Sequence, residues 1–298
     1  MPAQHGLSVT VPGAVQCWLD MLDQWGSLSP AVVLAPAIRL ARDGFPVSPV
    51  TAHWWAENAK HQLRAPCPFL PVPSAGSIFR NPDLAETLTD VALHGRSALY
   101  AGRRAKAICG VVQKHGGMLQ MEDLEAHRSE FVDPIRLRYR GIIDVFECPP
   151  NNQGLTALMA LETFQSFPLP TQRFSGAHVH LLIESMRAAY VDSKMHIAER
   201  SSMTLDPRAL LEDSSQKKMR RDRVNLNHAS THGNPAVSSE TVSFCVVDPH
   251  GNAVSMVNSN YQGFGTGYCW FFFPTIKKKR LVLQTFYLDL LKTNPTLI

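Results

Sequence analysis

The chain has 298 residues, a formal net charge of +4 and 45% hydrophobic residues. A chain of this length can bury a sizeable core, either as one large domain or as two smaller ones. The charge excess is too small to indicate a nucleic-acid partner, and we expect the basic runs 103–106 and 217–223 to be solvated helix faces.

Cysteine usage, the N-terminal sequence and hydropathy narrow the protein class. The six cysteines lie far apart, with no C-x-x-C pair and no Cys/His spacing suited to zinc, so we expect free, partly buried thiols. The start MPAQHGLSVTVPG lacks the basic region and apolar core of a signal peptide. No apolar run is long enough to span a bilayer. We therefore expect a cytoplasmic protein without a membrane partner or a metal.

The first half of the chain is predicted to be mostly helical. Ser29 and Pro30 form an N-cap followed by proline at the first helical position. Pro36 is expected to start a new helix that ends at Gly44. Apolar residues at helical spacing predict three further helices, at 51–63, 84–93 and 105–112.

The pattern changes to strands at residue 134. Ile135, Leu137 and Tyr139 alternate with arginines, which predicts a half-buried strand with a basic outer face. A second strand is predicted at 142–148. Helices are then expected at 155–164, 177–197 and 206–223.

A polar loop leads into a predicted β-hairpin. The segment 225–240, NLNHASTHGNPAVSSE, has almost no large apolar residue and is expected to be exposed and mobile. The hairpin follows as TVSFCVV, the turn DPHGN, and AVSMVNS. If the turn is centred on His250, Thr241 faces Ser259, with Cβ atoms about 5 Å apart on the same face. A slip of one residue would send the two hydroxyls to opposite faces.

Thr241 has two interpretations. A threonine at the start of a strand is usually just a β-branched residue that favours strands. A threonine that becomes N-terminal after cleavage carries its own base, because its free α-amine has a pKa of about 7.7–8.0 and can accept the hydroxyl proton. Such a nucleophile needs an exposed loop before it and a rigid strand beneath it, and this sequence supplies both.

The sequence gives weaker evidence for a phosphate site, a metal site or a serine nucleophile. The segment 263–267, GFGTG, resembles a phosphate-binding loop but lacks the P-loop lysine. His178 and His180 are two apart on a predicted helix and point in different directions, so they do not form a metal site. No G-x-S-x-G nucleophile motif is present.

The hairpin carries a family resemblance. TVSFCVVDPHGNAVSMVNSNYQGFGTG resembles the start of the small subunit of the γ-glutamyltranspeptidase (glutathione hydrolase) family. These N-terminal-nucleophile hydrolases are precursors that cut themselves before a threonine. Upstream segments agree in the same order, from about residue 7 onward: SVTVPGAVQCW, AIRLARDGFPVS, GGMLQMEDLEAHR, PIRLRYRGIIDVFECPPNNQG and ESMRAAYVDSKMHIAE.

The resemblance implies a fold and a division of the chain. The implied fold is α+β, part of an αββα sandwich with a helix-rich first half. Residues 1–240 would be a large-subunit-like region and 241–267 the start of a small-subunit-like region, followed by an atypical tail, 268–298, unrelated to the family. In that tail, 281–291 could form a short amphipathic helix, and 268–298 is expected to pack poorly and leave its aromatics exposed.

The resemblance also assigns roles to residues. Thr241 matches the nucleophile and new N-terminus, and Ser259 stands where the family has a second threonine that hydrogen-bonds the nucleophile. Tyr261 occupies the place of an asparagine that contacts the glutamyl group in many members, with Asn258 and Asn260 as possible substitutes. The implied reaction attacks the γ-glutamyl amide of glutathione or another γ-glutamyl compound, and water or an amino acid resolves the acyl-enzyme. No cofactor or nucleic acid is implied.

Several family features are not recognisable in this sequence. These are an N-terminal arginine that clamps the substrate carboxylate and, in the second half of the small subunit, an acidic residue, a Ser-Ser pair and an oxyanion-hole Gly-Gly pair. Loss of one oxyanion donor costs ~10²–10³ in rate. We therefore expect slow or absent self-cleavage and glutathione hydrolysis near background. The alternatives are a related amidase with another acyl donor, suggested by Tyr261, or a non-catalytic truncated product.

Overall fold

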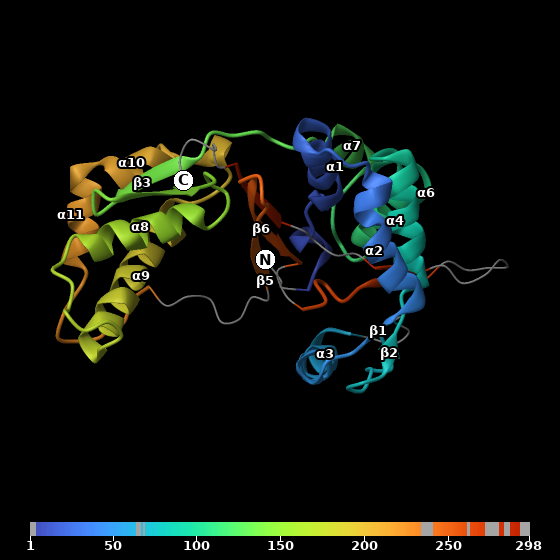
Figure 1. The fold of residues 1–298 in the computed structure, drawn as a ribbon, viewed down its shortest axis with the longest axis horizontal. Helices are drawn as coiled ribbons and strands as arrows, with labels where there is room; N and C mark the ends of the chain where they lie inside the picture. Colours follow the sequence, from blue (N-terminus) through green and yellow to red (C-terminus); the bar gives the residue numbers. More distant parts are fainter. Residues whose placement is uncertain are drawn as a thin grey trace. The chain divides into compact units, whose positions relative to one another are not determined.

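The structure is a computed structural model of the chain. It describes residues 4–63, 67, 69–233, 241–260, 263–271, 280–282 and 287–292, with side chains up to residue 268. The chain forms two compact units (Figure 1). The first comprises residues 1–130, 238–243 and 257–288, and the second comprises 131–237, 244–256 and 289–298. Each is built around its own apolar cluster.

The first unit is mainly helical, as predicted. Its helices are α1 (Ala14–Trp25), α2 (Pro30–Asp43), α3 (Pro49–Gln62), α4 (Pro82–His94), α5 (Ser97–Tyr100), α6 (Gly102–Lys114) and α7 (Met121–Ala126), preceded by the short η1 (Gly6–Ser8). Between them, β1 (Phe45–Pro46) pairs with β2 (Ile78–Phe79). The described helices α1, α5 and α7 were not predicted, because α1 lacks a side-chain cap and the other two are short.

Helix α2 begins and ends where the sequence predicted, but the helix boundary predicted at Pro36 is wrong. It begins at Pro30 after the N-cap Ser29 and ends before Gly44, as the sequence indicated. Pro36 does not start a new helix but lies inside α2. A proline removes one backbone hydrogen bond and crowds the preceding turn. Packing of α2 along α4 keeps the helix continuous past that residue.

Tyr100 organises the core of the first unit. Its hydroxyl donates to the carbonyl of Pro12 at 2.6 Å and accepts from the backbone N–H of Gln16 at 3.1 Å. Burial of the ring raises the pKa of Tyr100 to about 12. Arg96 lies over the same ring and donates to the carbonyl of His127 at 2.9 Å. These bonds fix the segment before α1 to the end of α7.

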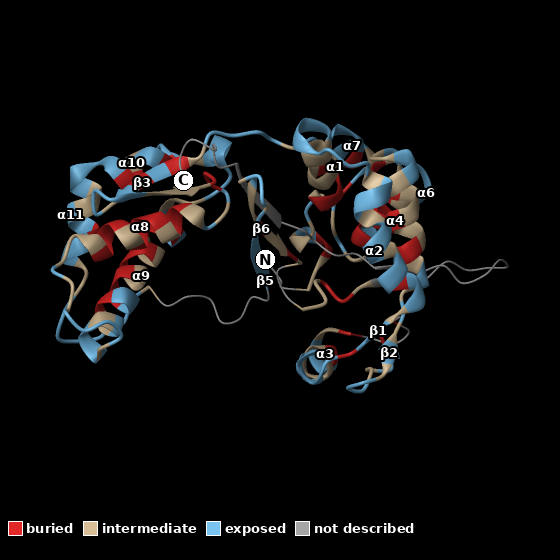
Figure 2. Ribbon diagram, viewed as in Figure 1, coloured by how far each residue is buried: buried red, intermediate tan, exposed pale blue. Residues whose placement is uncertain are grey.

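The second unit joins a two-stranded sheet to helices. Its hairpin, β3 (Ile135–Tyr139) and β4 (Ile143–Glu147), has the predicted alternation, with Leu137 opposite Val145. The helices are α8 (Gly154–Gln165), α9 (Gly176–His196), α10 (Pro207–Glu212) and α11 (Ser214–Asp222), with the short η2 (Arg200–Ser202) before α10. Figure 2 shows buried residues along α8 and α9, which pack together.

The helix predicted at 206–223 is interrupted. Asp213 has an extended backbone, and its Oδ1 accepts from the backbone N–H of Ser215 at 2.8 Å and of Gln216 at 3.1 Å. Asp213 is therefore the N-cap of a new helix, α11. An aspartate inside an apolar repeat does not reveal this break, because its side chain can also point to solvent.

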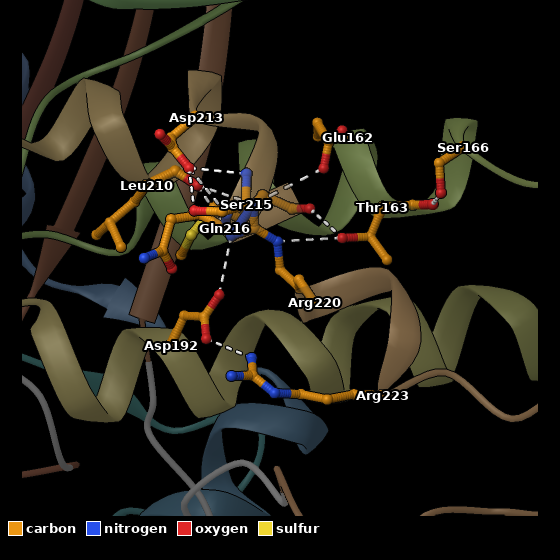
Figure 3. Close-up of polar contacts among 11 residues, drawn as sticks. Glu162, Thr163, Ser166, Asp192, Leu210, Asp213, Ser215, Gln216, Arg220 and Arg223 are labelled. Atoms are coloured by element: carbon orange, nitrogen blue, oxygen red, sulfur yellow. Dashed lines mark hydrogen bonds and ion pairs between the residues drawn. The ribbon is translucent and has the colours of Figure 1, made fainter. Parts of the chain in front are cut away.

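Two of the residues predicted to lie on solvated basic faces are in fact enclosed. Arg220 is fully buried on α11, and Arg104 on α6 pairs with Asp90 at 2.6 Å with its side chain 11% exposed. Arg220 donates to Asp192 at 2.9 Å, to the carbonyl of Leu210 at 2.8 Å and to Thr163 at 3.2 Å (Figure 3). A buried guanidinium persists only where its donors find such acceptors.

The last part of the chain adds strands. The hairpin strands β5 (Thr241–Val247) and β6 (Ala253–Ser259) form a sheet with β9 (Tyr287–Lys292), in the order β5-β6-β9. Strand β7 (Cys269–Phe271) pairs antiparallel with β8 (Arg280–Val282). The helix considered at 281–291 is therefore wrong, since 280–282 and 287–292 are strands. Tyr268 contradicts the predicted poor packing of 268–298, since its ring packs against the core of the first unit. The side chains from residue 269 onward lie outside the described part of the structure.

Three further observations concern cysteines, possible metal ligands and helix hydropathy among the described residues. The five cysteines that the structure describes in full are not joined by disulfides, as expected: Cys17, Cys67, Cys109, Cys148 and Cys245. No group of three or more potential metal ligands lies among the described residues. None of the described helices is both long and apolar enough to cross a bilayer.

Candidate active site

The turn of the β5–β6 hairpin sets its register. The Asp248 carboxylate accepts from the backbone N–H groups of His250 at 2.9 Å and Asn252 at 2.8 Å, and from the Asn252 side chain at 2.7 Å. These bonds, above all the one from the Asn252 side chain, lower the pKa of Asp248. Gly251 takes a φ of +82°, which a larger residue rarely adopts. The turn is thus closed symmetrically about His250.

The register brings the two predicted hydroxyls together. Thr241 Oγ1 and Ser259 Oγ are 2.9 Å apart, and another pair on the same face, Cys245 Sγ and Ser255 Oγ, lies 3.5 Å apart. Both pairs are symmetric about residue 250, so the predicted opposition of Thr241 and Ser259 is confirmed. Thr241 is exposed, whereas Ser259 is only 6% exposed. The buried hydroxyl therefore holds the exposed one in a fixed position.

The other predicted site residues, on either side of Ser259, make different contacts. The Asn260 side-chain amide donates to the carbonyl of Gly263 at 2.6 Å and thereby closes its own turn. Asn258 Oδ1 is buried without a hydrogen-bond partner among the described residues. By strand alternation, Asn258 projects to the face opposite Ser259. The prediction for Tyr261 falls outside the described residues.

The glycine-rich segment is a docking element. In residues 263–268, which we name the docking segment, Phe264 N–H donates to Gln62 Oε1 at 2.6 Å. The Phe264 ring packs 5.3 Å from Phe69 and 5.7 Å from Trp55. Gly267 has a φ of +71°, and a Cβ there would overlap the carbonyl oxygen of Gln62. The glycines therefore allow close contact with α3, which explains the segment without a phosphate.

Tyr268 ends the docking segment. Its ring stacks on His115 at a centroid distance of 3.5 Å, and its hydroxyl donates to the carbonyl of Gln4 at 2.7 Å. Burial, followed by the charge of Lys114, lowers the pKa of His115, so the imidazole favours its neutral form. The sequence pattern did not identify Gln62 or His115, because neither lies near the hairpin along the chain.

The two helix histidines have separate environments, as expected. His178 lies edge-on to Phe164 at 5.5 Å, whereas His180 Nε2 lies 2.8 Å from the carbonyl oxygen of Asn225. Residues 225–233 contain no helix or strand, in agreement with the predicted loop. Residues 234–240 lie outside the described part of the chain.

The hydroxyl pair has a definite chemical capability. A threonine hydroxyl attacks a carbonyl only when a base accepts its proton, and cleavage before Thr241 would place its own α-amine beside that hydroxyl. Ser259 can orient the nucleophile by a hydrogen bond, as its 2.9 Å distance allows. A cross-strand hydroxyl pair also stabilises a sheet with no chemistry at all.

The sequence matches a known family over most of its length. Residues 1–270 match the family described as Gamma-glutamyltranspeptidase. The chain is 32% identical over 271 residues to the Glutathione hydrolase-like YwrD proenzyme of Bacillus subtilis (strain 168), covering 87% of this chain and 50% of that protein. It is 31% identical over 268 residues to the Acylase ACY 1 proenzyme of Pseudomonas sp. (strain SE83), covering 87% of this chain and 48% of that protein.

A solved structure shows the same fold. The crystal structure of cephalosporin acylase from Bacillus halodurans matches with a TM-score of 0.79 and 34% identity, covering 90% of this chain and 51% of that chain. The predicted α+β fold, part of the αββα sandwich of N-terminal-nucleophile hydrolases, is thereby confirmed. The chain spans about half the length of the curated relatives that it matches.

Proposed function

The chain belongs to the gamma-glutamyltranspeptidase family, and from this membership we propose that Thr241 is the nucleophile of an amide-cleaving reaction. The observation that carries the proposal is the 2.9 Å distance between the Thr241 and Ser259 hydroxyl oxygens. Two relatives are named as proenzymes, which agrees with activation by cleavage of a precursor. Ser259 is the residue that orients the nucleophile.

The first reaction is cleavage of the chain itself. Thr241 Oγ attacks the carbonyl carbon of Glu240, the C–N bond breaks, and the nitrogen takes up the hydroxyl proton. Water then hydrolyses the resulting ester, leaving a carboxylate on Glu240 and restoring the Thr241 hydroxyl. The released α-amine has a pKa of about 7.7–8.0 and serves as the base for the next substrate.

The second reaction uses an external amide. The proposed acyl donor is glutathione or another γ-glutamyl compound, and the acyl group passes to Thr241 and then to water or an amino acid. Asn258 stays a prediction from the sequence, because it projects to the face opposite the Thr241–Ser259 pair, although its buried Oδ1 has no hydrogen-bond partner among the described residues. Asn260 is a weaker candidate, since its amide closes a local turn. Tyr261 stays a prediction from its position in the sequence.

The decisive experiment measures cleavage by mass spectrometry of the purified chain over time. We expect fragments 1–240 and 241–298 to form slowly from the wild type, because the oxyanion-hole pair of the family is not recognisable in this sequence, and none to form from Thr241→Ala. Ser259→Ala should slow cleavage about 10-fold or more, if the lost hydrogen bond contributes about 1.4 kcal/mol to the transition state. Ser255→Ala is the matched control, because it removes a hydroxyl from the same strand and face.

Two outcomes contradict the proposal. A Thr241→Ala chain that is cut at the same bond would assign the cleavage to another agent. A wild-type chain that stays intact throughout the incubation would leave the hydroxyl pair as a strand contact, in a non-catalytic protein. Equal rates for Ser259→Ala and Ser255→Ala would remove the orienting role of Ser259.

Another acyl donor is the second candidate. The observation that favours it is the likeness to two proteins named as acylases, together with a tyrosine at position 261. γ-Glutamyl and glutaryl amides of the same amine differ only in the α-amino group. Faster release of the amine from the γ-glutamyl compound supports the first candidate, and faster release from the glutaryl compound supports the second.

A further inference from the structure

The docking segment, residues 263–268, forms a turn against the last residue of α3. Phe264 and Gly267 bound this turn, since the Gly267 N–H donates to the Phe264 carbonyl at 3.0 Å. Gln62 ends α3, and its Oε1 accepts from the Phe264 N–H at 2.6 Å. A Cβ on residue 267 would overlap the Gln62 carbonyl oxygen. One residue of α3 therefore contacts both ends of the turn.

The Gln62 side chain sets the orientation of the turn as well as its place. A backbone N–H can only donate, so the atom that faces it is the amide oxygen of Gln62. The Phe264 ring packs against Trp55 and Phe69, but apolar attraction has no preferred direction. A hydrogen bond, in contrast, weakens steeply as its angle falls. Gln62 Oε1 therefore fixes the direction of the peptide group before Phe264, which the ring contacts alone do not set.

A second hydrogen bond joins the docking segment to the end of β6. This strand ends at Ser259, and the side-chain amide of the next residue, Asn260, donates to the Gly263 carbonyl at 2.6 Å. A Cβ on Gly263 would lie 2.8 Å from Gln62 Oε1, so the chain at this residue also lies directly against α3. The end of β6 is therefore attached to α3 through the first two residues of the docking segment.

The same end of β6 carries the partner of the candidate nucleophile. Ser259 Oγ lies 2.9 Å from Thr241 Oγ1, and Ser259 is buried whereas Thr241 is exposed. Gln62, Ser259 and Thr241 all belong to the first unit, as does the docking segment. The series of hydrogen bonds that leads from α3 to the nucleophile thus lies within one compact unit.

We propose that Gln62 is a positioning residue for the Thr241 nucleophile, acting through the docking segment and Ser259. This inference rests on the proposed function. Gln62 orients the backbone that follows β6, and Ser259 at the end of β6 orients the Thr241 hydroxyl. A displacement of about 1 Å caused by a remote substitution can cost about 100-fold in rate, because attack on a carbonyl needs close alignment. Gln62 therefore affects the rate of cleavage through the position of Ser259.

The size of the effect is limited by the residue through which it acts. Loss of the Gln62 hydrogen bond should slow cleavage before Thr241 by about 3-fold to 10-fold, the range expected for one intramolecular hydrogen bond. The loss should not exceed that of Ser259→Ala. In a chain that already carries Ser259→Ala, removal of the Gln62 acceptor should slow cleavage by less than about 2-fold, because substitutions that act through one contact are not additive.

Two substitutions of Gln62 separate its hydrogen bond from its shape. Gln62→Met keeps the length of the side chain and removes the amide oxygen, whereas Gln62→Glu keeps an acceptor oxygen for the Phe264 N–H. Gln113→Met is the matched control. Gln113 lies in the same unit, and its side chain donates to the carbonyl of Leu119, outside the docking segment, at 2.8 Å. Both methionine variants thus remove one bond between a glutamine side chain and the backbone.

The test combines hydrogen exchange, followed by NMR, with the rate of cleavage under conditions in which every variant stays folded. Gln62→Met should speed exchange of the Phe264 amide and slow cleavage, Gln62→Glu should recover both, and Gln113→Met should change neither. Faster exchange with an unchanged cleavage rate would overturn the positioning role and leave the proposed function intact. Equal slowing of cleavage by the two methionine variants would assign the effect to stability alone, which also overturns the positioning role.

Three other results would overturn a particular step. Unchanged exchange of the Phe264 amide in Gln62→Met would overturn the attachment of the docking segment through Gln62. Fully additive effects of Gln62→Met and Ser259→Ala on the cleavage rate would overturn the route through Ser259. A wild-type chain that never cleaves would overturn the proposed function, and the positioning role with it.

Discussion

The two flanks of the β5–β6 hairpin are attached to the protein in different ways. Before the hairpin, residues 225–233, which we name the anchor segment, are held at Ser230 by the side chains of Glu184 and Arg187. After it, the docking segment is held by the Phe264 ring among other aromatics and by the neutral amide of Gln62. The first attachment depends on charge and therefore on pH, whereas the second depends on apolar contact area.

The largest effect is expected at Arg220, the buried arginine that joins α11 to Asp192 on α9 and to the Leu210 carbonyl. Arg220→Ala leaves Asp192 and the carbonyl of Leu210 without their buried donor, so it should lower the free energy of unfolding by about 3–5 kcal/mol. Urea denaturation followed by circular dichroism measures this. Lys218→Ala, on the same helix, removes only an exposed ion pair with Asp222 and should cost less than about 0.5 kcal/mol. Equal losses for the two variants would show that burial of Arg220 contributes nothing.

The next largest loss of stability is expected in the docking segment, which apolar contacts hold. Phe264→Ala removes a half-buried ring from the Trp55 and Phe69 cluster and should cost about 2 kcal/mol. Because no ionisable group is involved, the cost should be the same at pH 7 and at pH 5. Phe174→Ala is a suitable control, since that ring is 75% exposed. A cost that changes strongly between the two pH values would mean that the two flanks do not differ as described.

The stability contributed by Glu184, which holds the anchor segment, should instead depend on pH. Burial acts to raise the pKa of Glu184, but hydrogen bonds from Ser230 and the charge of Arg187 outweigh it, so the pKa is lowered. The ionised form therefore stabilises the fold above the ordinary glutamate range, and this contribution is lost as the pH falls through the lower folded value. Glu184→Gln should lose stability at pH 7 and approach the wild type in acid.

Parallel stability curves for the wild type and Glu184→Gln between pH 3 and pH 7 would contradict this prediction. The comparison must be made between variants, because Glu162 acts in the opposite direction. Burial raises the pKa of Glu162, with Arg220 opposing, so its neutral form is favoured in the fold. Its contribution therefore falls as the pH rises, which partly hides the Glu184 effect in the wild type alone.

The features that the sequence predicted are those that neighbouring residues determine. Ser29, Pro30 and Gly44 bound α2, and the symmetry of the turn about His250 set the opposition of Thr241 and Ser259. These signals act over one helical turn or one hairpin. The pairing of the two hydroxyls, which is central to the candidate site, was therefore accessible from spacing alone.

The features that were missed depend on distant contacts. Phe264 meets Gln62 across 202 residues of sequence, and Arg220 meets Thr163 across 57, so neither pair has a local pattern. Pro36 stays inside α2 because a neighbouring helix supports it. Residues 281–291 were considered a possible short amphipathic helix, yet short apolar runs fit helices and strands about equally well. Burial and pairing partner decide such cases, and a single sequence contains neither.

The smallest effect is expected at the end of the docking segment, where it separates two contributions. Tyr268→Phe keeps the ring that stacks on His115 and removes only the hydroxyl that donates to the Gln4 carbonyl. The loss should be about 1 kcal/mol, the usual value for one intramolecular hydrogen bond. Tyr268→Ala removes the stacking as well and should cost more, by roughly 0.5–1.5 kcal/mol beyond the lost buried area. If Tyr268→Phe alone costs as much as Tyr268→Ala, a polar contact holds the segment at this point, and the contrast between a charged flank and an apolar flank would then apply to Phe264 but not to Tyr268.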